Sequence, residues 1–65
     1  MKREAFDVLL KEVDAAARLG VSSSSLKRWR LSGRGPKFVK LGSLVRYRLI
    51  DVEHFVMSRV TSRSK

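Results

Sequence analysis

The sequence contains no cysteine and no long apolar run. Without cysteine, neither a disulfide framework nor a thiolate metal site can stabilise the chain, so its fold must rest on apolar packing. A chain of 65 residues then forms one domain with a thin core, which disfavours a buried catalytic cavity. The basic start, Met1 to Arg3, is soon interrupted by Glu4, so neither a signal peptide nor a membrane span is predicted. We expect a cytoplasmic protein.

Acidic residues are missing from one continuous segment of the chain. Residues 21–50 carry eight Lys and Arg and no Asp or Glu, whereas residues 1–20 carry four of each sign. The acid-free segment therefore accounts for most of the net charge of +9. Such one-sided charge is typical of a surface that neutralises phosphates. It favours nucleic-acid binding, with ribosomal or membrane-surface attachment as the alternatives.

The first half of the chain has the pattern of a short helix. Apolar side chains recur at helical spacing over Glu12–Leu19, and Gly20 stands where a helix stops. Residues 8–10 form an extended lead-in. The sequence predicts a first helix with a narrow apolar face.

A second helix is predicted directly after this glycine. Ser22 is a suitable N-cap, because its hydroxyl can accept a free backbone N–H at the helix start. The helix runs from Ser23 to about Leu31, with Leu26 and Trp29 facing inward, and Gly33 ends it. A helix, a short turn with glycine and another helix have the spacing of a helix-turn-helix.

Alternating residues then predict a β-hairpin. Val39 and Leu41 flank Lys40, Val45 and Tyr47 flank Arg46, and glycine in Gly42-Ser43 suits the first central position of a two-residue turn. The hairpin should have one apolar face and one basic face. The basic face is expected to consist of Lys40, Arg46 and Arg48.

A third helix is predicted from Asp51 to about Arg59, where apolar residues again recur at helical spacing. The folded domain should therefore span residues 1–59. Residues 60–65 should form a disordered basic tail.

The second helix carries the candidate DNA contacts. At 100° per residue, Ser24, Lys27, Arg28 and Leu31 point away from Leu26. Lys27 and Arg28 can contact guanine edges or phosphates, and Ser23 and Ser24 can bond phosphate near the helix N-terminus. Lys40, Arg46 and Arg48 would present charge to a neighbouring groove. An ordinary solvated face and a charge-protected strand edge are the alternatives.

Little in the sequence points to catalysis or to a cofactor. His54 is the only histidine, and Asp51 and Glu53 suit the first turn of the third helix better than a catalytic pair. Trp29 and Tyr47 are expected in the core rather than stacked on bases. Phe38, opposite in face to Val39, should be partly exposed. We expect no enzyme activity, no metal and no cofactor.

Five short motifs follow one another in the chain. They are AAARLGVS at 15–22, SLKRW at 25–29, GPKFVKLG at 35–42, VRYR at 45–48 and DVE at 51–53. Their order over Leu9–Val56 resembles the excisionase-like, winged-helix relatives of the MerR DNA-binding domain. The resemblance implies a mainly α-helical winged helix-turn-helix with a small β-hairpin. It places Ser24, Lys27 and Arg28 on the recognition helix and Lys40, Ser43 and Arg46 on the wing.

Three positions depart from the family pattern. Lys11 stands where a capping Ser or Thr is common, and Ile50 where a polar cap often precedes the aspartate. Each departure should loosen a helix start by about 1 kcal/mol. The wing tip, which often carries more basic residues, reads Gly42-Ser43-Leu44, and this weakens the case for minor-groove contact by the tip.

The resemblance implies two possible roles on double-stranded DNA in a bacterial cell. An excisionase, or recombination directionality factor, bends attachment-site DNA so that integrase excises a phage or mobile element. A small prophage or plasmid transcription regulator of the same fold binds an operator instead. The absence of a sensor domain and of a long dimerisation helix disfavours a small-molecule ligand and favours the first role. Integrase and neighbouring copies of the chain are then its expected partners, with the tail from Ser58 as a contact.

Overall fold

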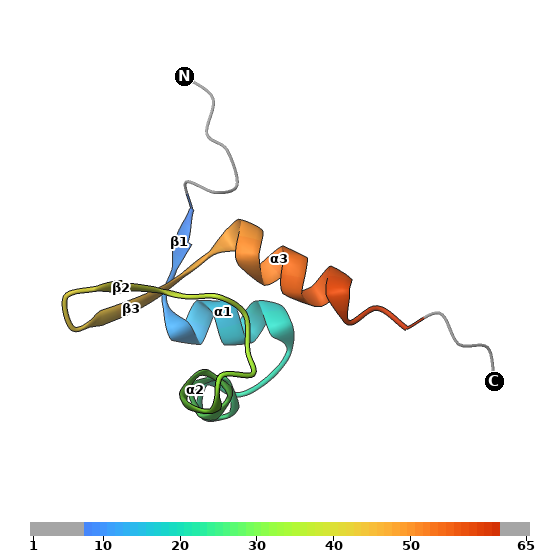
Figure 1. The fold of residues 1–65 in the computed structure, drawn as a ribbon, viewed down its shortest axis with the longest axis horizontal. Coiled ribbons are helices and arrows are strands. Elements are labelled where there is room, and N and C mark those ends of the chain that lie inside the picture. Colours follow the sequence, from blue (N-terminus) through green and yellow to red (C-terminus); the bar gives the residue numbers. More distant parts are fainter. Residues whose placement is uncertain (1–7, 62–65) are drawn as a thin grey trace, which may run out of the picture.

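The computed structural model describes residues 8–61 and contains three helices and three short strands within them (Figure 1). In chain order they are β1 (Leu9–Leu10), α1 (Glu12–Leu19), α2 (Ser23–Ser32), β2 (Val39–Leu41), β3 (Leu44–Arg48) and α3 (Leu49–Ser58). The strands form one antiparallel sheet in the order β1-β3-β2. This is the predicted winged helix-turn-helix, in which α1 and α2 form the helix-turn-helix and the β2–β3 hairpin forms the wing. Of the predicted tail, only Val60 and Thr61 are among the described residues.

The boundaries of α1 and α2 follow from the residues that cap them. Gly20 and Gly33 end the two helices with φ of 72° and 74°, a left-handed conformation that favours glycine. The Ser22 hydroxyl accepts a hydrogen bond from the Ser25 backbone N–H at 3.0 Å. Lys11 gives α1 no side-chain cap, as its departure from the family pattern indicates. Both predicted helices are therefore confirmed.

The predicted start of α3 was wrong by two residues. The helix begins at Leu49, and Arg48 occupies the N-cap position, so Ile50 lies inside the helix rather than at its cap. No side chain accepts the free N–H groups of this first turn. Instead, the Arg48 guanidinium donates to the carboxylate of Asp51 one turn later. β3 therefore continues into α3 without an intervening loop, and the ion pair links the last residue of the strand to the first turn of the helix. Sequence periodicity does not reveal such a junction.

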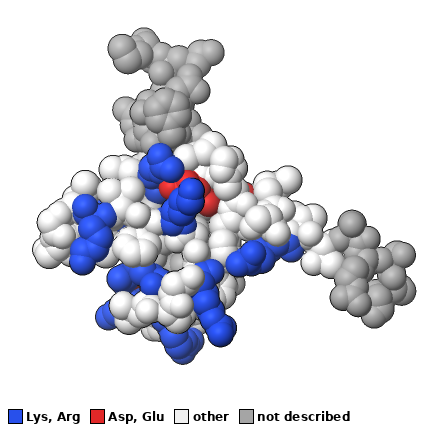
Figure 2. Space-filling view, in the orientation of Figure 1, with Lys and Arg blue, Asp and Glu red and all other residues white. Residues whose placement is uncertain are grey.

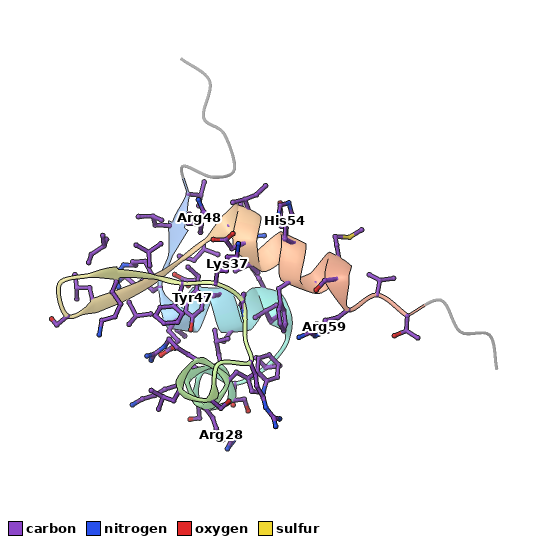
Figure 3. All side chains as sticks on the ribbon, in the orientation of Figure 1. Arg28, Lys37, Tyr47, Arg48, His54 and Arg59 are labelled. Atoms are coloured by element: carbon purple, nitrogen blue, oxygen red, sulfur yellow. The ribbon has the colours of Figure 1, made fainter. Side chains whose placement is uncertain are left out.

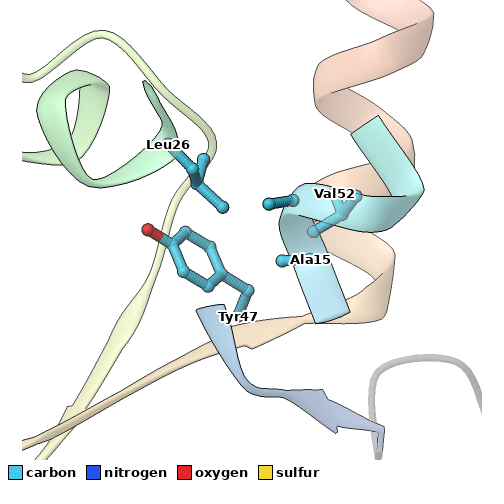
Figure 4. Packing of buried hydrophobic residues seen from close by; sticks show 5 residues of the cluster. Ala15, Leu26, Tyr47 and Val52 are labelled. Carbon is cyan, nitrogen blue, oxygen red and sulfur yellow. The ribbon is translucent and has the colours of Figure 1, made fainter. Parts of the chain in front are cut away.

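The core lies where α1 meets α2, β3 and α3 (Figure 4). Its buried residues are Ala15, Ala16, Leu26, Tyr47 and Val52. The two small alanines allow the neighbouring elements to approach α1 closely. Tyr47 is fully buried, as predicted. Half-buried Trp29 packs against Phe55, with 5.9 Å between ring centroids.

The predicted division of the wing into an apolar and a basic face was wrong. The two-residue turn pairs Leu41 with Leu44, so Val39 lies opposite Arg46 and Lys40 lies opposite Val45. Opposite residues of an antiparallel pair share a face. Lys40 therefore shares the face of Val45 and Tyr47, while Arg46 and Arg48 lie on the other face with Val39, Leu41 and Leu44. The alternation was correct within each strand, but a two-residue turn places odd-numbered residues of one strand opposite even-numbered residues of the other.

Phe38 behaves as predicted. It is 41% exposed, and its ring lies 6.3 Å from that of Tyr47, on the face opposite Val39. The turn itself is also as predicted, because Gly42 has a φ of 65° and the following Ser43 does not have a positive φ.

One polar network crosses the core. Arg30 of α2 donates two hydrogen bonds to the Glu12 carboxylate of α1, at 3.0 and 3.3 Å, and the Tyr47 hydroxyl of β3 donates to the same carboxylate at 3.0 Å. Burial raises the pKa of Glu12, but these hydrogen bonds and the nearby positive charges outweigh it, so the pKa lies below its ordinary value. Burial and the hydrogen bond to Glu12 raise the pKa of Tyr47 to about 12.

These shifts predict that the domain loses stability at both ends of the pH scale. Glu12 and Asp51 have lowered pKa values in the fold, so their contribution is present above their ordinary pKa values of 4.5 and 3.8 and is lost as pH falls below them. The Tyr47 hydroxyl is held protonated, so its contribution is lost as pH rises from 10.0 to about 12. Thermal unfolding followed by circular dichroism across this range measures both losses.

Two variants assign these losses to the network. Glu12→Gln should lower the free energy of unfolding at neutral pH by about 1–2 kcal/mol, since a partly exposed charged hydrogen-bond acceptor is lost, and should flatten the acid dependence. Tyr47→Phe should remove the alkaline dependence. An unchanged pH profile in both variants would show that the network does not stabilise the fold.

Candidate nucleic-acid interface

The four residues predicted on α2 all lie on its exposed side. Ser23, Ser24, Lys27 and Arg28 are solvent-exposed, while Leu26 is fully buried on the opposite side of the helix. Arg28 points away from the rest of the domain (Figure 3). The structure therefore brings these four side chains together on one helical face.

The serines at the start of α2 divide into two roles. Ser22 and Ser25 bond each other, with 3.0 Å between their hydroxyl oxygens, and Ser25 also accepts a hydrogen bond from the Arg28 guanidinium at 3.3 Å. Ser23 and Ser24 remain exposed. The cap therefore fixes the helix start and holds Arg28 along it, while the two middle serines stay accessible beside the N-terminus of the helix.

Two cations of the acid-free segment form ion pairs with acidic residues of the domain. Arg30, only 13% exposed, pairs with Glu12, and its guanidinium also lies 5.8 Å from the centre of the Phe38 ring. Arg48 pairs with Asp51 at 2.6 Å, and the hydrogen bond from Arg48 lowers the pKa of this carboxyl. Neither guanidinium is therefore available to another partner unless it gives up an intramolecular ion pair.

The other cations of the segment form no ion pair with any residue in the range 8–61. They are Lys27, Arg28, Arg34, Lys37, Lys40 and Arg46. Figure 2 shows Lys and Arg side chains over α2, the wing and the end of α3, with acidic ones only near the centre of this face. The positive charge that remains available is therefore concentrated on α2, the following loop and the wing.

The predicted wing residues are divided between positions. Ser43 is exposed in the turn, and Lys40 is exposed on the face that carries Tyr47. Tyr47 points toward Leu26 of α2 (Figure 4), so Lys40 lies on the α2 side of the wing. Arg46 is half-buried on the opposite face, where its guanidinium donates to the Val45 carbonyl at 2.8 Å.

Arg34 and Lys37 were not predicted as site residues, although both are exposed in the loop between α2 and β2. A loop has no periodicity from which side-chain direction can be read. The count of cations in the acid-free segment included both, and the motif GPKFVKLG included Lys37.

Comparison with known families gives one match. A family model described as a helix-turn-helix domain matches residues 9–60. The chain belongs to this helix-turn-helix family. The match extends from β1 through α3, so it covers nearly all of the described structure. No curated protein matches the chain.

Membership in this helix-turn-helix family indicates DNA binding, and α2 is the second helix of the motif, which enters the major groove in such domains. Across residues 8–61, no helix is long and apolar enough to cross a membrane. The same residues contain no group of three or more His, Cys, Asp or Glu side chains placed to hold a metal ion.

Replacing Arg28 tests this face. Arg28→Ala should weaken binding to duplex DNA about tenfold at moderate salt and reduce the dependence of log affinity on log salt by about one phosphate contact. Titration of a fluorescent duplex at several salt concentrations measures both.

Arg18→Ala is the matched control, because Arg18 is an exposed arginine of α1 beside α3 and the change in charge is identical. Equal losses in the two variants would mean that net charge, rather than the α2 face, determines affinity.

Proposed function

We propose that this helix-turn-helix protein binds double-stranded DNA with α2 in the major groove and the wing beside the adjoining backbone. The observation that carries the proposal is the exposed α2 face, where Lys27 and Arg28 stand with Ser23 and Ser24 and no acidic residue interrupts them. Such cations can bond guanine edges or phosphates, and hydroxyls near a helix N-terminus suit phosphate.

The wing adds a second contact of a different kind. Lys40 lies on the α2 side of the wing, so it and the α2 face can reach one duplex together. Ser43 at the turn can form a hydrogen bond with the DNA backbone. Arg46 can contact a phosphate only if its guanidinium gives up its hydrogen bond to the Val45 carbonyl. In this proposal Arg48 contributes chiefly by fixing the start of α3, since its guanidinium is occupied by Asp51.

The role that we propose on DNA is that of an excisionase, a recombination directionality factor. The order of motifs over residues 9–56 supports it. So does the presence on one small domain of two elements that can contact DNA, α2 and the wing. The protein would bend attachment-site DNA, and bond breakage would be left to integrase, so no catalytic role is assigned to this chain. A transcription regulator that binds an operator is the alternative role.

The first test separates duplex DNA from other nucleic acids. Gel shifts at equal salt should show tighter binding to duplex DNA than to either single strand or to an RNA duplex of the same sequence, because the major groove of RNA is too narrow for a helix. Equal affinity for all of them would contradict the major-groove arrangement and favour the RNA- or ribosome-associated class.

The second test addresses excision. The protein, added with the integrase encoded nearest to its gene, should increase excision from a plasmid that carries the attachment sites, and it should bend the bound site in a fluorescence energy-transfer assay. The Lys27→Ala/Arg28→Ala variant is the control and should lose both effects. Operator binding and repression without an effect on excision would establish the regulator instead.

A further inference from the structure

A shallow groove lies between the C-terminal end of α1, the side of α2 and the C-terminal half of α3. Its volume is about 540 Å³, within the range of pockets that hold small ligands or anchoring side chains. The apolar lining comes from all three helices and from the residue that follows Arg59. It consists of Leu19, Trp29, Phe55, Val56 and Val60.

Leu19 and Trp29 of this lining pack against the core, but its α3 end is more exposed than the fold requires. Val56 is 43% exposed and Val60 is 63% exposed, and Met57 beside them is 69% exposed. The buried core is complete without these side chains. Contiguous apolar surface that the fold does not use is typical of a protein interaction site.

Among residues 8–61, the charged residues that line the groove are both arginines. Arg34 and Arg59 line it and form no ion pair within the described part of the chain, and the Arg59 guanidinium lies 4.6 Å from the centre of the Phe55 ring. The acidic residue on this side of α3, Glu53, lines the adjoining hollow instead. An occupant must therefore offer apolar side chains to the floor and negative charge to the arginines.

DNA and a second copy of the chain fit this description poorly. DNA offers phosphates but little apolar surface for the floor, and the wing points to the opposite side of the molecule from the C-terminal end of α3 (Figure 1). A second copy would bring another net charge of +9 against the arginines. We propose that the groove binds an acidic amphipathic helix of another protein, with apolar anchors on one face in the helix-in-groove mode.

The protein carries its own reporter for this site, because Trp29 is its only tryptophan and lines the groove. The probe is a synthetic helical peptide with Leu at i, i+3, i+4 and i+7 and Glu at flanking positions. It should change the Trp29 emission in a saturable way. The same peptide with Lys in place of Glu, and a scrambled acidic peptide, should not.

Variants separate the apolar and the electrostatic parts. Val60→Asp should weaken peptide binding at least tenfold, since it places a carboxylate at the floor, and Arg34→Gln/Arg59→Gln should weaken it about fivefold to tenfold. Lys11→Gln/Lys40→Gln, at two exposed positions outside the groove, removes the same two charges as the arginine variant and should have no effect. Unchanged thermal unfolding confirms that each variant remains folded.

Four results would overturn the proposal. They are no saturable response to the acidic peptide, equal binding of the Lys peptide, displacement of the peptide by saturating duplex DNA, and a concentration-dependent dimer that Val60→Asp dissociates. The third result would assign the groove to DNA and the fourth to a second copy. The direct peptide titration is measured without DNA, so a failure of the proposed DNA function leaves its outcome unaffected.

Discussion

The carboxylate of Glu12 accepts hydrogen bonds from Arg30 and from Tyr47, so one side chain of α1 holds both α2 and β3. Within residues 8–61 the buried hydrophobic cluster has only five members, so few other contacts can fix the angle between α2 and the wing. The bidentate arginine contact adds direction to the attraction. The relative placement of α2 and the wing therefore depends on one acidic residue, Glu12, whose side chain is only 23% exposed.

The Glu12–Arg30 pair and the separate Arg48–Asp51 pair both supply negative charge to the strongly basic segment. Arg30 and Arg48 each have a carboxylate partner, and both partners, Glu12 and Asp51, lie outside the acid-free segment. The carboxylates that pair with the two structural arginines of the segment therefore come from α1 and α3. The other cations of the segment have no acidic partner within residues 8–61. DNA phosphates can supply the negative charge that they lack.

Local signals predicted most of the fold. The helix-ending glycines and the Ser22 cap define α1 and α2 because capping acts within a few residues, and the resulting exposed face of α2 was correct. The predicted wing faces were wrong although each strand alternates as expected. The length of the turn determines which residues of the two strands share a face, and the alternation within one strand does not show this. The Glu12–Arg30 pair spans 18 residues, and no periodicity in the sequence connects residues so far apart.

At the candidate DNA interface, the correctly and the wrongly predicted side chains differ in which element determines their direction. Where a side chain's direction depends on its own helix, the sequence predicted its exposure, as for Lys27 and Arg28. Where the direction depends on a second element, the sequence did not predict the exposure. Lys40 and Arg46 lie on opposite faces of the wing, and Arg48 is paired with Asp51. The eight cations of the acid-free segment are therefore not equivalent. Their contributions to DNA binding should follow their exposure and their freedom from ion pairs. The exposed cations that form no ion pair within residues 8–61 therefore rank first; they are Lys27, Arg28, Arg34, Lys37 and Lys40. Half-buried Arg46 follows, and the ion-paired Arg30 and Arg48 come last.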